Sequence, residues 1–180
     1  LCSTHFLFLE EPRPDTPNDR AGSPQAVAVA SRLSHFLWNT RSDEALRREA
    51  TSGRLLNTQE NVLESETNRL IDDPRFDAFI VNFTDEWLDL KNLLRDDPDI
   101  RLYPEYRGDD YLTESMGWET REFVKTLFRE NLPVSTLVES DFAMLNDRLA
   151  QHYELPPLLG SRVRQVTLPS GSPRGGLLTQ

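Results

Sequence analysis

The chain has 180 residues, of which 37% are hydrophobic and 28% are charged; this length and composition are typical of one globular domain. The net charge of −10 gives it no electrostatic basis for binding nucleic acid, which depends mostly on Lys and Arg. Anionic membrane surfaces are disfavoured for the same reason. No apolar run approaches the roughly 20 residues that a membrane-spanning helix needs.

Composition changes along the chain predict three parts. Prolines among polar residues at positions 11–25 predict that residues 1–22 form an extended arm and linker. Residues 23–155 are expected to form a helical domain, and residues 156–180 a tail. We expect both ends to be cuts within a longer polypeptide, because the chain begins without Met and a new element starts near its end. Cys2, the only cysteine, is either a partly buried thiol or the partner of a cysteine outside the chain.

Apolar residues recur at helical spacing in six segments, which predicts an all-α, orthogonal or bundle-like fold with about six helices. Ser42 is the expected cap of the second helix, and Asn57 with Glu60 the capping box of the third. Phe36 and Trp87 fall on apolar stripes and are expected to be buried. A helical turn through residue 137 and a short strand at 163–168 complete the prediction. The expected helices are 24–38, 43–52, 58–71, 74–90, 110–131 and one that starts at Ser140 or Asp141.

Motifs that carry chemistry are absent from the sequence. It contains no phosphate-binding Gly-rich loop, no nucleophile elbow, no zinc motif and no Cys-x-x-Cys-His haem attachment site. His5, His35 and His152 each lack a second ligand at a suitable spacing, so a satisfied polar role is favoured over metal or haem ligation. We therefore predict no catalytic residues, no metal site and no cofactor within this chain.

Carboxylates leave an alternative open. The acids of residues 84–89 flank Trp87, and a glycosidase needs two carboxyl groups about 5–10 Å apart across a cleft. Because Trp87 belongs to the predicted apolar stripe, a solvated helix face is favoured. Asp96, Asp97 and Asp99 could bind calcium through oxygen atoms, but the loop lacks the EF-hand register and is interpreted as a charged loop.

Large side chains on a second helix face are harder to explain. Tyr111 and Trp118 lie seven residues apart, away from the main stripe of the fifth predicted helix, and Val27 and Trp38 lie off the stripe of the first. Such residues indicate a helix buried on both sides, an interdomain contact or, less favoured, a ligand platform. With His35, beside Trp38, and Arg174, in the tail, they form our candidate interaction surface.

Residues 30–39, Ala-Ser-Arg-Leu-Ser-His-Phe-Leu-Trp-Asn, resemble the "ASRLSYFLWN" opening of a planctomycete-type domain of unknown function. The similarity continues through Asp73-Pro74-Arg75, Asn82-Phe83, Trp87-Leu88 and residues 141–150. Residues 1–7 resemble the end of the domain that normally precedes it, and residues 173–180 the start of the one that follows. Glu154 stands where a glycine-like position is expected, which Glu tolerates poorly when φ is positive.

The resemblance implies a large, secreted multidomain protein that also carries cytochrome-c-like modules, and hence a periplasmic or cell-envelope location. It supplies no catalytic residues, and any haem would lie in other domains. Our leading hypothesis is a non-catalytic helical interaction or scaffolding module whose partners are flanking domains of the same polypeptide, with a polysaccharide or redox partner also conceivable. The alternatives are an enzyme domain acting on polysaccharide through surface carboxylates, and an accessory domain of a haem or electron-transfer unit.

Overall fold

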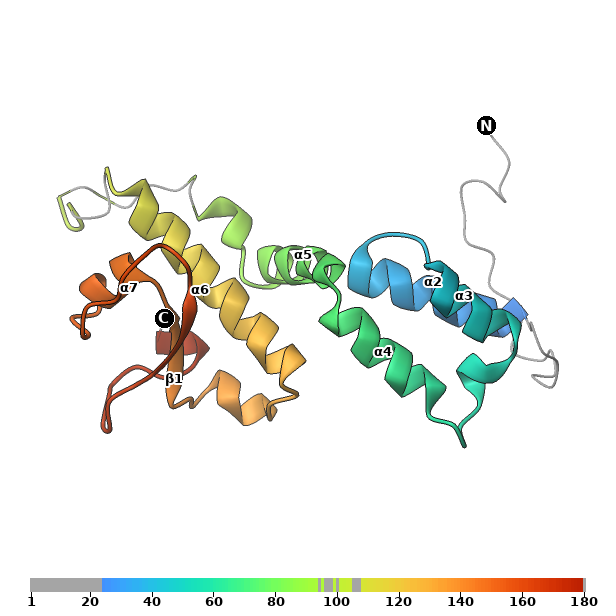
Figure 1. Cartoon of the computed structure of the whole chain (residues 1–180). Coiled ribbons are helices and arrows are strands. Elements are labelled where there is room, and N and C mark those ends of the chain that lie inside the picture. The colour runs from blue at the N-terminus through green and yellow to red at the C-terminus, as the bar shows by residue number, and fades with distance from the viewer. Residues whose placement is uncertain (1–23, 94, 96–98, 100, 105–107, 180) are drawn as a thin grey trace. The chain divides into compact units, whose positions relative to one another are not determined.

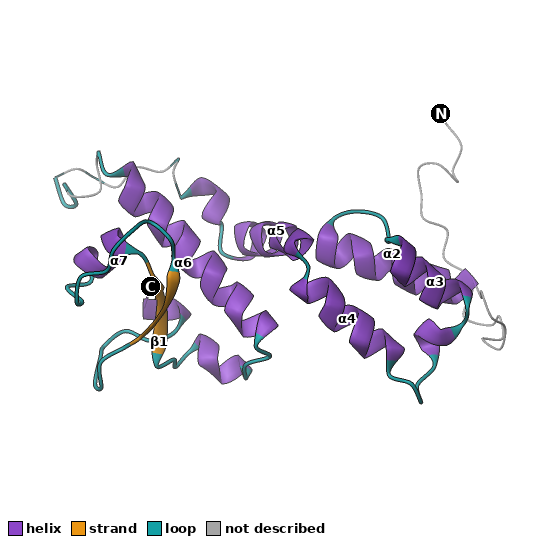
Figure 2. Ribbon diagram, viewed as in Figure 1, coloured by secondary structure: helices purple, strands orange, loops and turns teal. Residues whose placement is uncertain are grey.

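The computed structural model describes residues 24–93, 95, 99, 101–104 and 108–179. Within them the fold is mainly helical, with six α-helices and one small two-stranded sheet, which confirms the all-α prediction (Figures 1 and 2). The predicted arm of residues 1–22, with Cys2 and His5, lies outside the described residues. No helix of the described part has the length and apolar character that crossing a membrane requires.

The chain divides into two compact units, residues 1–79 and 80–180, and each is described by itself. The division falls inside helix α5 (Asp77–Trp87). The described part of the first unit contains α2 (Pro24–Trp38), α3 (Glu44–Thr51), α4 (Val62–Asp72) and the short 3₁₀ helices η1 (Arg54–Leu56) and η2 (Pro74–Phe76). The second contains η3 (Leu90–Asn92), α6 (Asp110–Arg129), η4 (Val134–Leu137), β1 (Phe142–Leu145), α7 (Asp147–His152), β2 (Arg164–Thr167) and η5 (Leu177–Thr179).

Helix α2 has the predicted bounds and packs on α3 and α4 through small residues and Leu37. The prediction that Phe36 is buried is wrong, since it is 66% exposed. Ser42 is not the cap of α3: its hydroxyl lies 3.0 Å from that of Ser34. Asp43 caps the helix instead, because its carboxylate accepts from the Leu46 amide at 2.9 Å.

The third predicted helix begins four residues later than expected. Asn57 and Glu60 do pair through their side chains, at 2.9 Å, but the Asn57 side chain also accepts from the Gln59 amide. That local hydrogen bond forms a turn in place of a helical start. Helix α4 then begins at Val62, after Asn61 adopts a left-handed φ of 49°.

The fourth predicted helix is correct at its start and too long at its end. Asp73 caps its first turn, since its side chain accepts from the Arg75 amide, and Phe76 is fully buried. Trp87, however, is 49% exposed, so its predicted burial is wrong. The helix stops at Trp87 because Asp89, with a φ of 58°, turns the backbone out of the right-handed helical region.

In the second unit, α6 follows the prediction closely, and η4 and β2 confirm the predicted turn and strand. The predicted sixth helix is wrong over its first residues, where the chain forms β1 instead. All four residues of β1 are buried, and they pair antiparallel with β2, Phe142 opposite Thr167. Spacing alone cannot separate a short buried strand from a helix. Helix α7 begins only after Asn146.

Candidate functional site

The segment of residues 173–179 is held against the second unit by close backbone contacts. Gly175 and Gly176 have φ angles of 150° and 100°, which L side chains rarely adopt. A Cβ atom on Gly175 would collide with the Ser140 carbonyl oxygen, and one on Gly176 would lie 2.5 Å from that of Val138. The two glycines therefore allow the segment to lie directly on the chain that leads into β1.

Arg174 and Leu177 fix the same segment through their side chains. The guanidinium carbon of Arg174 lies 3.7 Å from the centre of the Tyr153 ring, close enough for a cation–π interaction. Arg174 Nη1 also donates to the Thr179 carbonyl oxygen at 2.8 Å. Leu177 packs against the core cluster of Phe123, Phe142 and Met144. Arg174 of the candidate surface thus stabilises the docked segment.

Tyr153 connects the segment to a buried carboxyl group on α6. Its hydroxyl donates to Glu119 Oε2 at 2.7 Å, and Glu119 is only 1% exposed. Desolvation raises the pKa of Glu119 to about 7, although the hydrogen bond from Tyr153 and the charge of Arg174 act in the opposite direction. The carboxyl group therefore changes its charge near neutral pH inside the unit.

Asn146 joins α6 to α7 through three hydrogen bonds. Its side-chain oxygen accepts from the Leu149 amide at 3.0 Å and so caps α7. Its amide nitrogen donates to Ser115 Oγ at 2.8 Å and to the Tyr111 hydroxyl at 3.3 Å. Because Asn146 is fully buried, these bonds satisfy a group that would otherwise be costly to bury.

Tyr111 and Trp118 of the candidate surface are neighbours on α6. Their rings meet edge to face with centres 6.3 Å apart, and Trp118 is 38% exposed. The Tyr111 hydroxyl donates to Asp147 Oδ1 at 2.7 Å, a bond that raises the pKa of Tyr111 to about 12. Tyr111 is thus tied into the Asn146 network, and Trp118 presents the more open edge of the pair.

An open apolar hollow of about 320 Å³ lies beside α6. Its walls come from three segments: the chain after α5, the face of α6 and the docked segment of residues 173–179. Leu178 in its wall is 83% exposed. Docking of the C-terminal segment therefore builds one side of this hollow. The lining residues are Leu88, Leu90, Leu93, Met116, Thr120, Leu177 and Leu178.

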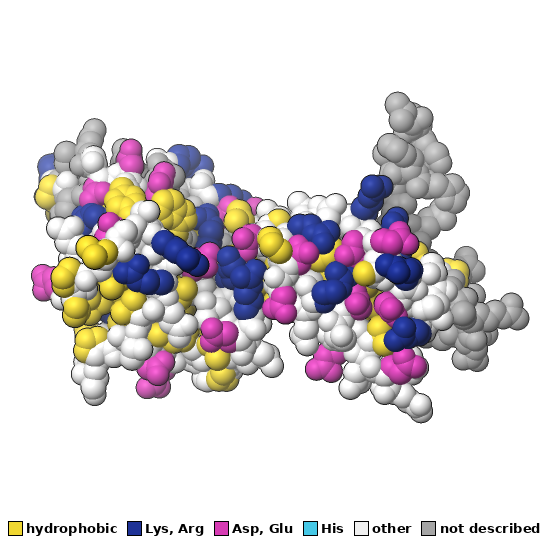
Figure 3. Space-filling view, viewed as in Figure 1, with side chains coloured by type: hydrophobic (Ala, Val, Ile, Leu, Met, Phe, Trp, Pro, Cys, Tyr) yellow, Lys and Arg dark blue, Asp and Glu magenta, His cyan; other side chains and the backbone are white. Residues whose placement is uncertain are grey.

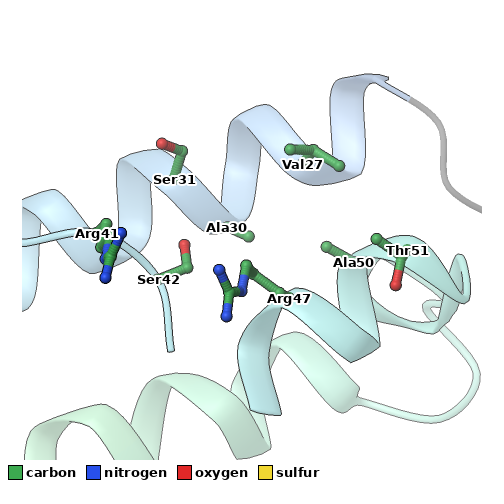
Figure 4. A pocket seen from close by; sticks show the side chains of 8 residues that line it. All are labelled: Val27, Ala30, Ser31, Arg41, Ser42, Arg47, Ala50 and Thr51. Carbon is green, nitrogen blue, oxygen red and sulfur yellow. The ribbon is translucent and has the colours of Figure 1, made fainter. Parts of the chain in front are cut away.

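A second hollow, of about 210 Å³, lies between α2 and α3 in the first unit (Figure 4). Val27 of the candidate surface belongs to its lining and is 45% exposed. In Figure 4, Arg41, Ser42 and Arg47 gather at one end, and Val27, Ala50 and Thr51 lie toward the other. Ala30 and Ser31 of α2 complete the lining.

Trp38 and His35, the remaining residues of the candidate surface, have different environments. Trp38 is 3% exposed, its indole nitrogen donates to the Leu70 carbonyl oxygen at 2.8 Å, and the Arg75 guanidinium lies 3.4 Å from its ring centre. Trp38 therefore belongs to the core of its unit. His35 is exposed, and its Nδ1 lies 2.8 Å from the Ser31 carbonyl oxygen.

The acids of residues 84–89 are each held by a polar neighbour. Asp85 pairs with Arg121 at 2.6 Å, Glu86 with Lys91 at 2.7 Å, and Asp89 accepts from Asn92. None of the three acids lines either hollow. These contacts explain how α5 and the chain after it carry so many acids.

The remaining predicted ligands are placed as follows. Asp99 pairs with Arg101 at 2.7 Å, whereas Asp96 and Asp97 lie outside the described residues. His152 is half-buried with its ring centre 5.3 Å from that of Tyr153. In the described part of the chain, no three His, Cys, Asp or Glu side chains come together as a metal site would require. That the chain holds no cofactor stays a prediction.

Sequence reasoning missed Glu119 as the centre of this arrangement. The signal was present, because Glu119 falls at helical spacing between Leu112, Met116 and Phe123 on the apolar face of α6. A carboxyl group on such a face is either paired or shifted in pKa. Arg41 and Arg47 carried no such signal, since the hollow that they line is completed by Val27, Ala30 and Ser31 of α2.

The fold and the site thus define a mainly helical domain that fastens its own C-terminal segment. A protein-family model described as PSD4, protein of unknown function (DUF1592), matches residues 25–155. Because the match covers more than two thirds of the chain, the chain belongs to this family. The predicted resemblance to a domain of unknown function is confirmed in this form. Neither the comparison with curated proteins nor that with solved structures found a match.

Proposed function

We propose that this chain is a non-catalytic helical interaction module that organises neighbouring domains of a cell-envelope, cytochrome-c-associated multidomain protein. The observation that carries the proposal is the docking of residues 173–179, which resemble the start of the domain that normally follows. Gly175, Gly176 and Arg174 fasten this segment to the second unit. The module would thereby fix the position from which the following domain begins.

The apolar hollow beside α6 supports the same proposal. Leu177 and Leu178 form part of its wall, so a domain that continues from this segment would start next to an exposed apolar surface. Exposed apolar surface of this kind is typical of interaction sites. On the face drawn in Figure 3, apolar side chains also gather over the unit of residues 80–179.

The test compares the 180-residue chain with a longer polypeptide that adds the predicted following domain. Hydrogen–deuterium exchange should slow at residues 88–93 and 116–120 in the longer polypeptide, because the following domain covers the hollow. Unchanged exchange at these residues would overturn the proposal. Leu178→Asp should abolish the added protection, whereas Leu159→Asp, at an equally exposed leucine of the same unit, should retain it.

The location and the haem partner belong to the same proposal and come from the family resemblance alone. We infer an extracytoplasmic protein in which haem is held by other domains. Fractionation of cells that express the longer polypeptide tests the location, and recovery in the cytoplasmic fraction would contradict it. An absorbance spectrum of the purified polypeptide tests for a Soret band.

A further inference from the structure

The hollow between α2 and α3 combines positive charge with apolar surface. Its lining contains two guanidinium groups and no carboxylate, in a chain that has 30 acidic and 20 basic residues. Three hydroxyl groups, from Ser31, Ser42 and Thr51, line it as well. An anion that enters the hollow would therefore meet two guanidinium groups and no acid of the lining.

Both guanidinium groups are available to a ligand. Arg41 is exposed and has no hydrogen bond or ion pair among the described residues. Arg47 pairs with Glu44 at 2.6 Å, but the two side chains are 53% and 68% exposed. Such an exposed pair within one helix is weak, so an incoming anion can compete with Glu44 for Arg47.

Ser42 lines the hollow beside these groups and is hydrogen-bonded to α2. Its hydroxyl lies 3.0 Å from that of Ser34, which is fully buried on α2. Ser34 donates its own proton to the Ser31 carbonyl oxygen at 3.0 Å, so Ser42 donates to Ser34 and would turn its proton to a ligand oxygen on binding. Planar guanidinium groups with a hydroxyl beside them match the geometry of carboxylate or phosphate oxygens.

The rest of the hollow is small and mainly apolar, with Thr51 at the end opposite the arginines. Val27 and Ala50 supply short side chains away from the arginine end, and Ala30 lies between the two ends (Figure 4). A volume of about 210 Å³ suits a molecule of several carbon atoms and excludes a folded partner. An inorganic anion would leave the apolar end in contact with water.

We infer that the hollow between α2 and α3 binds a small organic anion, with its oxyanion group at Arg41, Ser42 and Arg47 and its apolar body against Val27, Ala30 and Ala50. This site lies in the unit of residues 24–79. It does not depend on docking at residues 173–179, so either proposal can fail without the other.

The experiment is a titration of the ¹⁵N-labelled 180-residue chain with hexanoate, followed by amide chemical shifts. Saturable shifts are expected at residues 27–31 and 41–51. Arg41→Gln should weaken binding about fivefold or more, the loss of a charge-assisted hydrogen bond, without unfolding the chain because Arg41 has no partner to lose. Val27→Asp should weaken binding through repulsion. Arg162→Gln, an exposed arginine of the other unit, is the matched control and should bind as the parent chain does.

Two further probes separate the parts of the ligand. Hexanol lacks the anionic group and inorganic phosphate lacks the apolar body, so both should bind more weakly than hexanoate. The inference is overturned if hexanoate gives no saturable shifts, or if Arg41→Gln and Arg162→Gln bind it equally. If hexanol bound as tightly as hexanoate, the role of the arginine end would be overturned. If phosphate bound as tightly, the role of the apolar end would be overturned.

Discussion

The two units of this chain place their polar groups differently. Five of the six buried polar or charged residues of the described chain, all except Ser34, lie in residues 80–180. The first unit instead keeps its charges near the surface, where Arg69 bridges Asp43 and Glu66 and packs with Arg75 around Trp38. Ser34 is the one fully buried polar side chain in the described part of the first unit, so its core is held mainly by apolar packing.

The second unit uses buried polar groups to join segments far apart in the sequence. Asn146 holds α6 against α7, and Glu119 meets Tyr153, on which Arg174 stacks. Buried networks of this kind specify one arrangement of the elements, because each group left unpaired would be costly. The difference indicates that the second unit is the one built to fix a defined geometry.

The largest expected effects test whether the two units are separate cooperative bodies. Phe76 and Phe123 are both fully buried, one in each unit. Replacing either by alanine should cost about 3–5 kcal/mol. We expect Phe76→Ala to speed hydrogen exchange in residues 24–79 only, and Phe123→Ala in residues 108–179 only. Loss of protection in both units from either change would show one cooperative body instead.

The next effect separates the units by pH. The pKa of Glu119 rises from 4.5 to about 7 on folding, so the folded state holds its proton more tightly. Its contribution to stability is therefore complete below pH 4.5 and is lost as the pH rises to about 7, by about 3 kcal/mol in all. Glu119→Gln should remove this dependence of stability on pH. At pH 8 the second unit of the variant should therefore be more stable than that of the parent chain.

The whole 180-residue chain is unfolded with urea at pH 5 and at pH 8. Hydrogen exchange at residues of the second unit then reports the stability of that unit at each pH. Glu114→Gln, at an exposed acid on the same helix, is the control and should leave the slope as it is in the parent chain. An equal pH dependence in Glu119→Gln and the parent would mean that water reaches the carboxyl group.

Local signals predicted much of this fold. Helix α2 begins where Pro24 can occupy a first helical position, and α6 shows an apolar stripe along its whole length. The predictions were wrong where tertiary packing decides: Phe142–Leu145 became a strand because β2 supplies its hydrogen bonds. The fourth predicted helix was too long because a turn at Asp89 ends it, which apolar spacing does not reveal.

The site was less predictable than the fold. Tyr111 and Trp118 were singled out from one helix and do lie together. The contacts of Arg174 with Tyr153, or of Asn146 with Ser115, join residues more than 20 positions apart. Such pairs depend on how the elements pack, and no spacing rule within one element can supply them.

The smallest expected effect comes from a position that the sequence did flag. Glu154 has a φ of 55°, and the Leu155 amide donates to the Ala150 carbonyl oxygen at 2.9 Å, which is how a helix ends on a left-handed residue. Because glycine adopts this conformation without strain, Glu154→Gly should stabilise the second unit by about 1 kcal/mol. Gln151→Gly, inside α7, should destabilise it by about as much. Thermal unfolding should show a higher melting temperature for Glu154→Gly and a lower one for Gln151→Gly.

If Glu154→Gly lowered the melting temperature instead, the side chain of Glu154 would contribute more than its backbone strain costs. The end of α7 would then depend on an interaction of that carboxylate.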